Sequence, residues 1–212
     1  MDTIINQTKA LMNEEFIELE SDELNASEEA AMTLIVKAIT TKTIYLKALQ
    51  TILSKAWNPS KGMKIQQIHV NMFSISFKHE WDRKRILESR PWSIMGSHLV
   101  VRDWPTNLPI EDISFDSSPF WIRIFGLPPN QMTKNNSGKI GSKIGKVLDI
   151  DFTTDGKISW NKYLRIQVEI NITQPLHSGF HRSKEVNSKS WMRLRLGHVQ
   201  KGCSFQPLKA QH

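Results

Sequence analysis

The sequence predicts an α+β fold in which a β-α-β-β-α-β unit is followed by a smaller β-α-β-β unit. Three observations carry this prediction. Apolar residues alternate with polar ones over 72–78, they recur at three- and four-residue steps over 43–57, and a Pro-, Asp- and Ser-rich stretch at 105–118 separates two patterned regions. Period two is typical of strands and period 3.6 of helices, and the polar stretch predicts a linker.

The first unit is predicted to open with a strand and a helix. Thr33–Ile39 is β-branched and apolar, which favours a strand. Residues 43–57 have the spacing of an amphipathic helix, with Thr41 or Thr43 as the candidate N-cap. The Asn, Pro and Gly residues of 58–62 end that helix.

Two strands, a helix and a hairpin complete the first unit. Strands are predicted at 65–70 and 72–78, a helix at 80–89 before Pro91, and a hairpin of 92–95 with 98–104 around Gly96-Ser97. This order is the ferredoxin-like split unit, the architecture of RNA-recognition modules, so the 30–104 domain is predicted to be RRM-like.

The second unit, 119–175, is predicted to be shorter. A strand at 120–125, a helix at 130–144 and strands at 146–152 and 163–172 give β-α-β-β, without a last helix and strand. After Pro175 the chain turns polar and basic, so 176–212 is predicted to be a poorly ordered basic tail.

Charge divides the chain unevenly. The 212 residues hold 28 bases and 21 acids, a net charge of +7. Residues 1–30 hold nine acids and one base (1 − 9 = −8), so the remaining 182 residues carry +15 (27 − 12). Residues 1–29 are interpreted as a flexible acidic arm. The basic body is typical of a protein with a polyanionic partner, of which nucleic acid is the commonest, and charge alone is equally consistent with a surface that is basic only for solubility.

Cysteine content and hydropathy exclude other classes. The single cysteine, Cys203, rules out a disulfide framework within the chain and a four-cysteine zinc site. No apolar run is long enough to cross a bilayer. We expect an intracellular protein, nuclear or cytoplasmic with the nucleus favoured, that has no membrane partner and no small-molecule substrate.

Several motifs together resemble a known family. In order they are Ile86-Leu87-Glu88-Ser89-Arg90-Pro91-Trp92, Gly96 with Leu99-Val100-Val101 and Trp104, Phe120-Trp121-Ile122-Arg123-Ile124-Phe125-Gly126-Leu127-Pro128, Ile140-Gly141 with Ile144-Gly145, Tyr163-Leu164-Arg165-Ile166-Gln167-Val168, and Pro175-Leu176 with Gly179-Phe180. Over about 30–203 the chain resembles the plant domain of unknown function that precedes a Cys-Cys-His-Cys zinc knuckle in proteins derived from LINE-type retrotransposons. The resemblance implies nucleic-acid binding.

The same resemblance implies that the knuckle is degenerate. Its pattern C-x2-C-x4-H-x4-C places His198 and Cys203 as vestigial ligands, whereas Ser190 and Arg193 stand where the first two cysteines should be. A serine hydroxyl is a poor zinc ligand and a guanidinium cannot be one, so no metal and no other cofactor is expected.

The first unit lacks a predicted base-stacking platform. If Phe73, Ile75 and Phe77 face the core, the stacking positions of the third strand hold Met72 and Ser74. Contact with nucleic acid would then depend on charge. Of the tryptophans, Trp57, Trp81, Trp92, Trp104 and Trp121 are interpreted as structural, and Trp160 and Trp191 as stacking candidates.

Basic residues fall into three candidate groups. One lies on or near the 80–89 helix, one on the helix of the second unit, and one in the C-terminal part. With the two tryptophans, the candidate nucleic-acid-binding residues are Arg83, Lys84, Arg85, Arg90, Lys134, Lys139, Lys143, Lys146, Trp160, Lys162, Arg165, Arg182, Lys184, Lys189, Trp191, Arg193, Arg195 and Lys201.

No enzyme motif is recognised. Asp149 and Asp151 form an acidic pair, but the sequence places no third acid near them, and we expect them to face solvent or to pair with Lys146. We therefore expect a non-enzymatic protein that binds RNA or single-stranded DNA. The alternatives are a self-assembly module, in which the acidic arm docks onto a neighbour's basic body, and a degenerate element fragment without selected activity.

Overall fold

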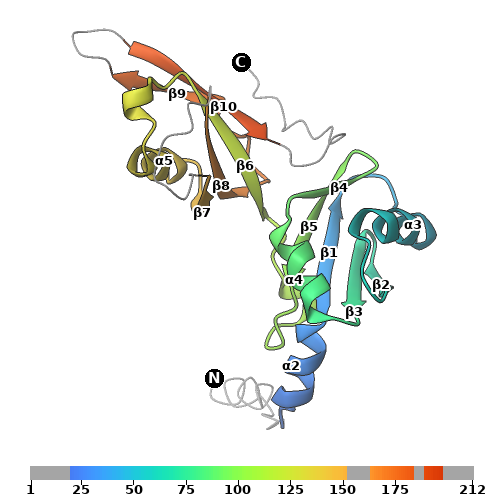
Figure 1. Ribbon diagram of the computed structural model, residues 1–212. Helices are drawn as coiled ribbons and strands as arrows, with labels where there is room; N and C mark the ends of the chain where they lie inside the picture. Colours follow the sequence, from blue (N-terminus) through green and yellow to red (C-terminus); the bar gives the residue numbers. More distant parts are fainter. Residues whose placement is uncertain (1–19, 152–162, 184–188, 198–212) are drawn as a thin grey trace, which may run out of the picture.

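The computed structural model describes residues 20–151, 163–183 and 189–197. Two units, each built on a five-stranded antiparallel sheet, follow one another along the chain (Figure 1). The predicted α+β class is confirmed.

Sheet A forms the first unit and has the strand order β2-β3-β1-β5-β4. Its strands are β1 (Thr33–Ile39), β2 (Met63–His69), β3 (Met72–Phe77), β4 (Trp92–Ile94) and β5 (Ser97–Asp103), and its helices are α3 (Leu46–Trp57) and α4 (Glu80–Glu88). With β1 and β3 in the centre, this is the ferredoxin-like order, in which β4 adds a hairpin strand beside β5. The predicted RRM-like architecture is confirmed by this topology.

Local sequence explains most of the boundaries in sheet A. Strand β1 coincides with its prediction. Helix α3 begins later than predicted, because Tyr45 and neither Thr41 nor Thr43 occupies the N-cap, and it closes on Asn58 with a left-handed backbone (φ 42°). The β4–β5 turn lies on Met95 and Gly96, one residue before the predicted pair, and both have positive φ, as a type I′ turn requires.

Part of the predicted acidic arm is helical. Helix α2 (Glu23–Ala31) is capped by Asp22, whose carboxylate accepts a hydrogen bond from the backbone N–H of Asn25 at 3.2 Å. The prediction of a flexible arm is therefore wrong for residues 23–29, because capping and helix-forming residues outweigh their charge. Residues 1–19 of the arm lie outside the described part of the chain.

Sheet B forms the second unit and repeats the strand order as β7-β8-β6-β10-β9. Its elements are β6 (Ser117–Phe125), a 3-10 turn η2 (Pro129–Gln131), α5 (Lys134–Gly141), β7 (Lys146–Ile150), β8 (Tyr163–Asn171), β9 (Gly179–Ser183) and β10 (Lys189–Gly197). Position by position, β6, β7, β8, β9 and β10 correspond to β1, β2, β3, β4 and β5 of sheet A. Between β8 and β9 no helix corresponds to α4.

The prediction of a poorly ordered tail from residue 176 is wrong for β9 and β10. Trp191 to Leu196 alternate strictly between apolar residues that face the core and residues that do not, which is the pattern of a half-buried strand. Ser190 and Arg193, where a knuckle's first cysteines would fall, lie in β10, where they pair with Arg182 and Phe125. His198 and Cys203 lie outside the described residues.

The predicted linker 105–118 is also corrected. Residues 117 and 118 already belong to β6, and a 3-10 turn, η1 (Ile110–Asp112), precedes two buried side chains, Ile113 and Phe115. These two pack with Ile35, Met72 and Val100 on the face of sheet A that points away from α3 and α4. The segment is thus part of the fold, because it covers an apolar sheet face.

Polar contacts join the two units where β5 meets β6. The Arg102 guanidinium donates to the Glu169 carboxylate at 2.9 Å and to the Ser117 carbonyl oxygen at 2.7 Å. The His98 ring nitrogen Nε2 lies 2.9 Å from the Ser118 hydroxyl oxygen, and both residues are buried. These contacts hold the start of sheet B against sheet A.

Candidate nucleic-acid interface

The face of sheet A that an RNA-recognition module would offer to bases is already occupied. Phe73, Ile75 and Phe77 are 0%, 0% and 4% exposed and belong to the helix-side core, as predicted. On the opposite face, Met72 is buried beneath Phe115 and its neighbours. Sheet A therefore offers no stacking surface on this face.

Sheet B has a face that points away from α5, and its side chains form what we call the open face. Alternation places Ile122, Ile166 and Leu194 in the core with α5, and places every second residue on the other side. The open face comprises Trp121, Arg123 and Phe125 of β6, Tyr163, Arg165 and Gln167 of β8, and Trp191, Arg193 and Arg195 of β10. All nine side chains are half-buried or exposed.

Strand register sorts the open face into three rows. The middle row is Arg165, Arg123 and Arg195, which are direct partners across β8, β6 and β10. On one side of it Tyr163, Phe125 and Arg193 form a second row. On the other side Gln167, Trp121 and Gly197 form the third. A row of arginines therefore runs between two rows that contain aromatic rings.

The charge of the arginine row is only partly compensated by carboxylates of the described residues. Directly opposed side chains in a sheet have Cβ atoms about 5 Å apart, and like charges at that distance destabilise the pair. Arg165 has a carboxylate partner in Asp151, 3.0 Å away. Among the residues that the structure describes, neither Arg123 nor Arg195 forms an ion pair. The row therefore carries a net positive charge on the open face of the described residues.

Aromatic rings hold the guanidinium groups in place. The Arg165 guanidinium carbon lies 4.0 Å from the Trp121 ring centre, that of Arg123 lies 4.9 Å from Tyr163, and that of Arg195 lies 5.6 Å from Phe125. Such contacts contribute about 0.5–2 kcal/mol each and keep the cations over the sheet. They also arrange rings and cations alternately across the face.

One guanidinium N–H group on this face lacks a hydrogen-bond acceptor among the described residues. The Nε of Arg123 is buried and has no hydrogen-bond partner in the described part of the chain. It lies beside Gly197, where a Cβ atom would come within 3.2 Å of it. A buried unsatisfied donor costs free energy, and a ligand oxygen would remove that cost.

The β9–β10 edge adds a further ring. Trp191, a predicted stacking candidate, is 46% exposed and meets the His181 ring edge-on, with centroids 4.8 Å apart. Arg193 and Arg195 of the same strand are exposed. Trp191, Arg193 and Arg195 of the predicted C-terminal group thus lie on the same surface as Arg165.

The predicted basic group on α4 serves the fold instead. Arg83 donates to the Thr33 carbonyl oxygen and pairs with Asp103, and Arg90 donates to the Val101 carbonyl oxygen at 3.1 Å. Burial lowers the pKa of Arg90. Of this group only Lys84 is exposed and makes none of these contacts.

Arg85 of the same group is held by buried acceptors. Its guanidinium donates to the Trp57 carbonyl oxygen at 2.6 Å and lies 3.4 Å from the Asp82 carboxylate. Asp82 is buried, and hydrogen bonds from the Ser60 side chain and backbone, together with Arg85, lower its pKa although burial opposes this. The arginine therefore balances a buried carboxylate, a structural role that its sequence position does not reveal.

The predicted lysines of the second helix lie away from the open face. Lys134, Lys139 and Lys143 are exposed and line a wide groove on the outer side of α5. Lys146 is exposed on β7, opposite Glu169 of β8. These side chains belong to a second basic surface.

The remaining candidates divide by position. Arg182 lies on β9, where it donates to the Gln131 side-chain oxygen at 2.9 Å, on the α5 side of the sheet. Lys189 begins β10. The other candidates, Trp160, Lys162, Lys184 and Lys201, lie outside the described residues.

Predictions about tryptophans and acids are confirmed in part. Trp57 and Trp92 are core residues, as predicted, whereas Trp81 is 67% exposed beneath Arg85, because α4 turns it toward solvent. Asp149 and Asp151 both face solvent, as one of the two alternatives predicted, and Asp151 pairs with Arg165 and not with Lys146.

Sequence reasoning missed five members of the open face, namely Trp121, Arg123, Phe125, Tyr163 and Gln167. A usable signal exists: residues 121–125 and 163–168 alternate with period two, and the residues opposite in phase to the aliphatic ones are all aromatic, arginine or glutamine. Trp121 was assigned to the core because it stands beside apolar neighbours.

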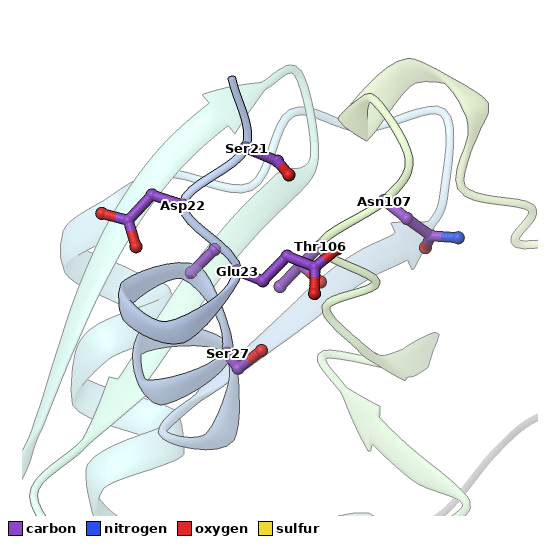
Figure 2. A pocket seen from close by; sticks show the side chains of 7 residues that line it. Ser21, Asp22, Glu23, Ser27, Thr106 and Asn107 are labelled. Carbon is purple, nitrogen blue, oxygen red and sulfur yellow. The ribbon is translucent and has the colours of Figure 1, made fainter. Parts of the chain in front are cut away.

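A separate hollow of about 540 Å³ lies beside the N-terminal end of α2 (Figure 2). Side chains from α2 and from the segment after β5 line it, among them Asp22, Glu23, Thr106 and Asn107. Its charged side chains are acidic, so it is unsuited to a phosphate. None of the helices in the described ranges is long and apolar enough to span a bilayer.

Comparison with known proteins identifies relatives for the first unit. Residues 26–111 match a family described as "Domain of unknown function (DUF4283)". An uncharacterized protein of Arabidopsis thaliana, At4g02000, is 24% identical over 95 residues, which are 45% of this chain. The chain spans 29% of that relative's length. The predicted resemblance is thus confirmed in part: residues 26–111 match a domain of unknown function, and a plant protein is a weak relative.

Solved structures similar to the chain contain tandem RNA-binding domains. Sex-lethal RNA recognition domains 1 and 2 of Drosophila melanogaster align with 66% of this chain and 85% of theirs, at 17% identity and a TM-score of 0.28. The three N-terminal RNA binding domains of the yeast splicing factor Prp24 align with 81% of this chain and 68% of theirs, at 14% identity and a TM-score of 0.30. The fold assignment rests on the strand order of each sheet and not on these scores.

Proposed function

We propose that this chain is a non-enzymatic, retrotransposon-derived protein that binds RNA or single-stranded DNA on the open face of sheet B. The observation that carries the proposal is the row Arg165, Arg123 and Arg195 between rows of aromatic rings. Arginines neutralise phosphates and release counterions, and rings stack on bases. The phosphates and the bases of a single strand can therefore both be bound on one surface.

A single strand suits this surface better than a duplex. The rings of Trp121, Phe125 and Tyr163 can stack only on bases that are not already stacked in a double helix. Cation–π contacts already restrain the guanidinium groups over neighbouring rings, so less side-chain entropy is lost on binding. The proposed retrotransposon origin rests on the sequence motifs.

The proposal is tested by removing two exposed arginines from the open face. We expect Arg193→Gln with Arg195→Gln to weaken binding of a labelled single-stranded oligonucleotide at least about tenfold at low salt, and to reduce the slope of log K against log salt by about 1.4. Fluorescence anisotropy over a salt series measures both quantities. Both side chains are exposed, so the variant should remain folded.

A charge-matched control lies on the other unit. Lys55→Gln with Lys64→Gln removes the same two charges from exposed positions of α3 and β2. Its affinity should stay within about threefold of the unchanged protein, since it alters only the long-range field. Equal losses from the two double variants would refute a localised site, and absence of binding at low salt would refute the function.

The stacking component has its own test. Phe125→Leu retains an apolar side chain but removes the ring, and should cost about 1–3 kcal/mol of binding free energy to single strands. Binding to a duplex of the same length should change little. An equal loss for both ligands would show that the ring supports the fold and does not stack on bases.

A further inference from the structure

The second unit lacks a counterpart of helix α4, and this leaves space beside α5. In sheet A, α3 and α4 together cover the helix side, and Ile86 of α4 is fully buried there. Among the described residues of the second unit, α5 is the one α-helix on the corresponding side, because residues 172–178 connect β8 to β9 without a helix and contribute only side chains such as Ile172 and Leu176 to the core. The result is a hollow of about 280 Å³ between α5 and the β9–β10 hairpin.

The floor of this hollow is apolar. Leu127 and Met192 are each 8% exposed, and Ile140 of α5 is half-buried beside them. An apolar floor of this kind favours binding of a flat ring system, because moving the ring from water onto an apolar surface lowers the free energy. The small volume excludes a large ligand.

The rim of the hollow is polar and cationic. Two amides, Gln131 and Asn136, and two cations, Lys139 and Arg182, line it, and none of its lining residues is acidic. The Arg182 guanidinium is fixed by its 2.9 Å bond to the Gln131 side-chain oxygen. The Asn136 amide donates to the Gln131 carbonyl oxygen at 2.9 Å, which ties the rim together.

The Arg182 side chain has a hydrogen-bond donor without an acceptor among the described residues. Its Nε is buried and lacks a hydrogen-bond partner within the described ranges. A guanidinium prefers to donate two parallel hydrogen bonds to one phosphate or carboxylate. Here one of its nitrogens is engaged by Gln131, and another lacks an acceptor.

We propose that this hollow binds a nucleoside monophosphate unit, with the base on Leu127, Ile140 and Met192 and the phosphate between Lys139 and Arg182. The amides of Gln131 and Asn136 supply donors and acceptors for the base edge. The unit can be a free nucleotide or the phosphorylated end of a strand. The site lies on the opposite side of sheet B from the open face and does not depend on the proposed function.

The test observes the rim amides directly. In ¹H–¹⁵N spectra of the full chain, adenosine monophosphate should shift the side-chain amide signals of Gln131 and Asn136. Adenosine and inorganic phosphate should do so only at concentrations at least about tenfold higher, because each has half of the contacts. No shift with the nucleotide, or an equal response to phosphate, would overturn the proposal.

Two variants localise the ligand. Arg182→Gln and Lys139→Gln should each weaken nucleotide binding at least about fivefold by isothermal titration calorimetry. Lys134→Gln, on the same helix but not lining this hollow, should leave affinity within about twofold. Lys139 is exposed, so its variant remains informative if Arg182→Gln unfolds. Equal effects of Lys139→Gln and Lys134→Gln would contradict the site.

Oligonucleotides separate the two sources of the nucleotide. If a 5′-phosphorylated strand shifts the Gln131 and Asn136 signals and its 5′-hydroxyl counterpart does not, the ligand is a strand end. If only the free nucleotide shifts them, the ligand is a free nucleotide. Loss of oligonucleotide binding in the Arg193 and Arg195 double variant reports on the open face alone, so the two proposals can fail separately.

Discussion

Sheets A and B share one strand order, yet their faces away from the helices are used in opposite ways. On sheet A this face carries Ile35, Met72 and Val100 and is closed by Ile113 and Phe115. On sheet B it carries the arginine row and the aromatic rings. The same backbone therefore forms a buried layer in one unit and an exposed surface in the other.

The difference teaches that topology does not identify the binding face. A two-sided apolar sheet gains stability by burying both faces, and residues 105–116 serve that purpose for sheet A. Sheet B keeps three opposed arginines at a cost in stability, which a folding requirement alone does not explain. Under the proposed function, this cost is retained because the arginines contact nucleic acid.

The largest effect on stability should come from placing an arginine in β1, the central strand of sheet A, and this is compared with placing an isoleucine in β6, the central strand of sheet B. Ile35 of β1 is fully buried, and Ile35→Arg places an unpaired cation beneath Phe115. We expect a loss of at least about 4 kcal/mol in the free energy of unfolding, measured by urea denaturation. The matched change, Arg123→Ile on β6, should alter stability by less than about 1.5 kcal/mol and yet weaken nucleic-acid binding. Similar stability losses would contradict the contrast between the two faces.

The junction between the sheets should make stability depend on pH. Burial lowers the pKa of His98 to about 4, although a hydrogen bond between its ring and the Trp92 backbone opposes the shift. The unfolded chain has a histidine pKa near 6.5, so between pH 6.5 and 4 it binds more protons than the folded chain. Stability should therefore fall as pH falls through this window, by about 3 kcal/mol in total.

Urea denaturation at several pH values measures this effect, and His98→Gln is the control. Glutamine retains a hydrogen-bonding group near Ser118 and does not titrate, so the slope between pH 6.5 and 4 should decrease. An unchanged slope would assign the pH dependence to other groups.

Sequence predicted sheet A well because its elements are marked locally. Thr33–Ile39 and the alternation of Phe73, Ile75 and Phe77 need no partner to be recognised. The Arg182 and Arg85 roles could not be predicted, because Gln131 and Trp57, which accept their hydrogen bonds, are distant in sequence. Local patterns report which face a residue occupies, whereas the partner on that face is set by the tertiary fold.

The open face was only half predicted for a related reason. Arg165, Trp191, Arg193 and Arg195 were recognised as basic or stacking residues, but their convergence depends on β10 pairing with β6. The knuckle pattern competed for the same residues, so the alternation from Trp191 was overlooked. Residues that fit two patterns are better assigned to the one that buries more apolar surface, here Met192 and Leu194.

A smaller effect is expected where the two sheets are tied together. Arg102 donates to Glu169 and to Ser117, with both charged side chains about one-fifth exposed. Arg102→Gln should lower the free energy of unfolding by about 1–3 kcal/mol, since it leaves Glu169 partly buried without its cation. Glu169→Gln, which can still accept a hydrogen bond from Ser117, should cost less. Thermal denaturation compares the two, and a larger loss from Glu169→Gln would contradict this account.

The smallest effect should come from deleting the acidic residues at the N-terminus. The result discriminates between nucleic-acid binding and self-association as explanations of the uneven charge distribution. Residues 1–19 contain four acids and one base, so their deletion raises the net charge from +7 to +10. If the open face binds nucleic acid, deletion should strengthen oligonucleotide binding about two- to threefold at low salt, and the gain should disappear as salt screens the long-range field. If the acidic segment instead docks onto a neighbouring copy, sedimentation should show that deletion abolishes self-association. Because the deletion leaves α2 and both sheets intact, neither outcome would be caused by loss of the fold.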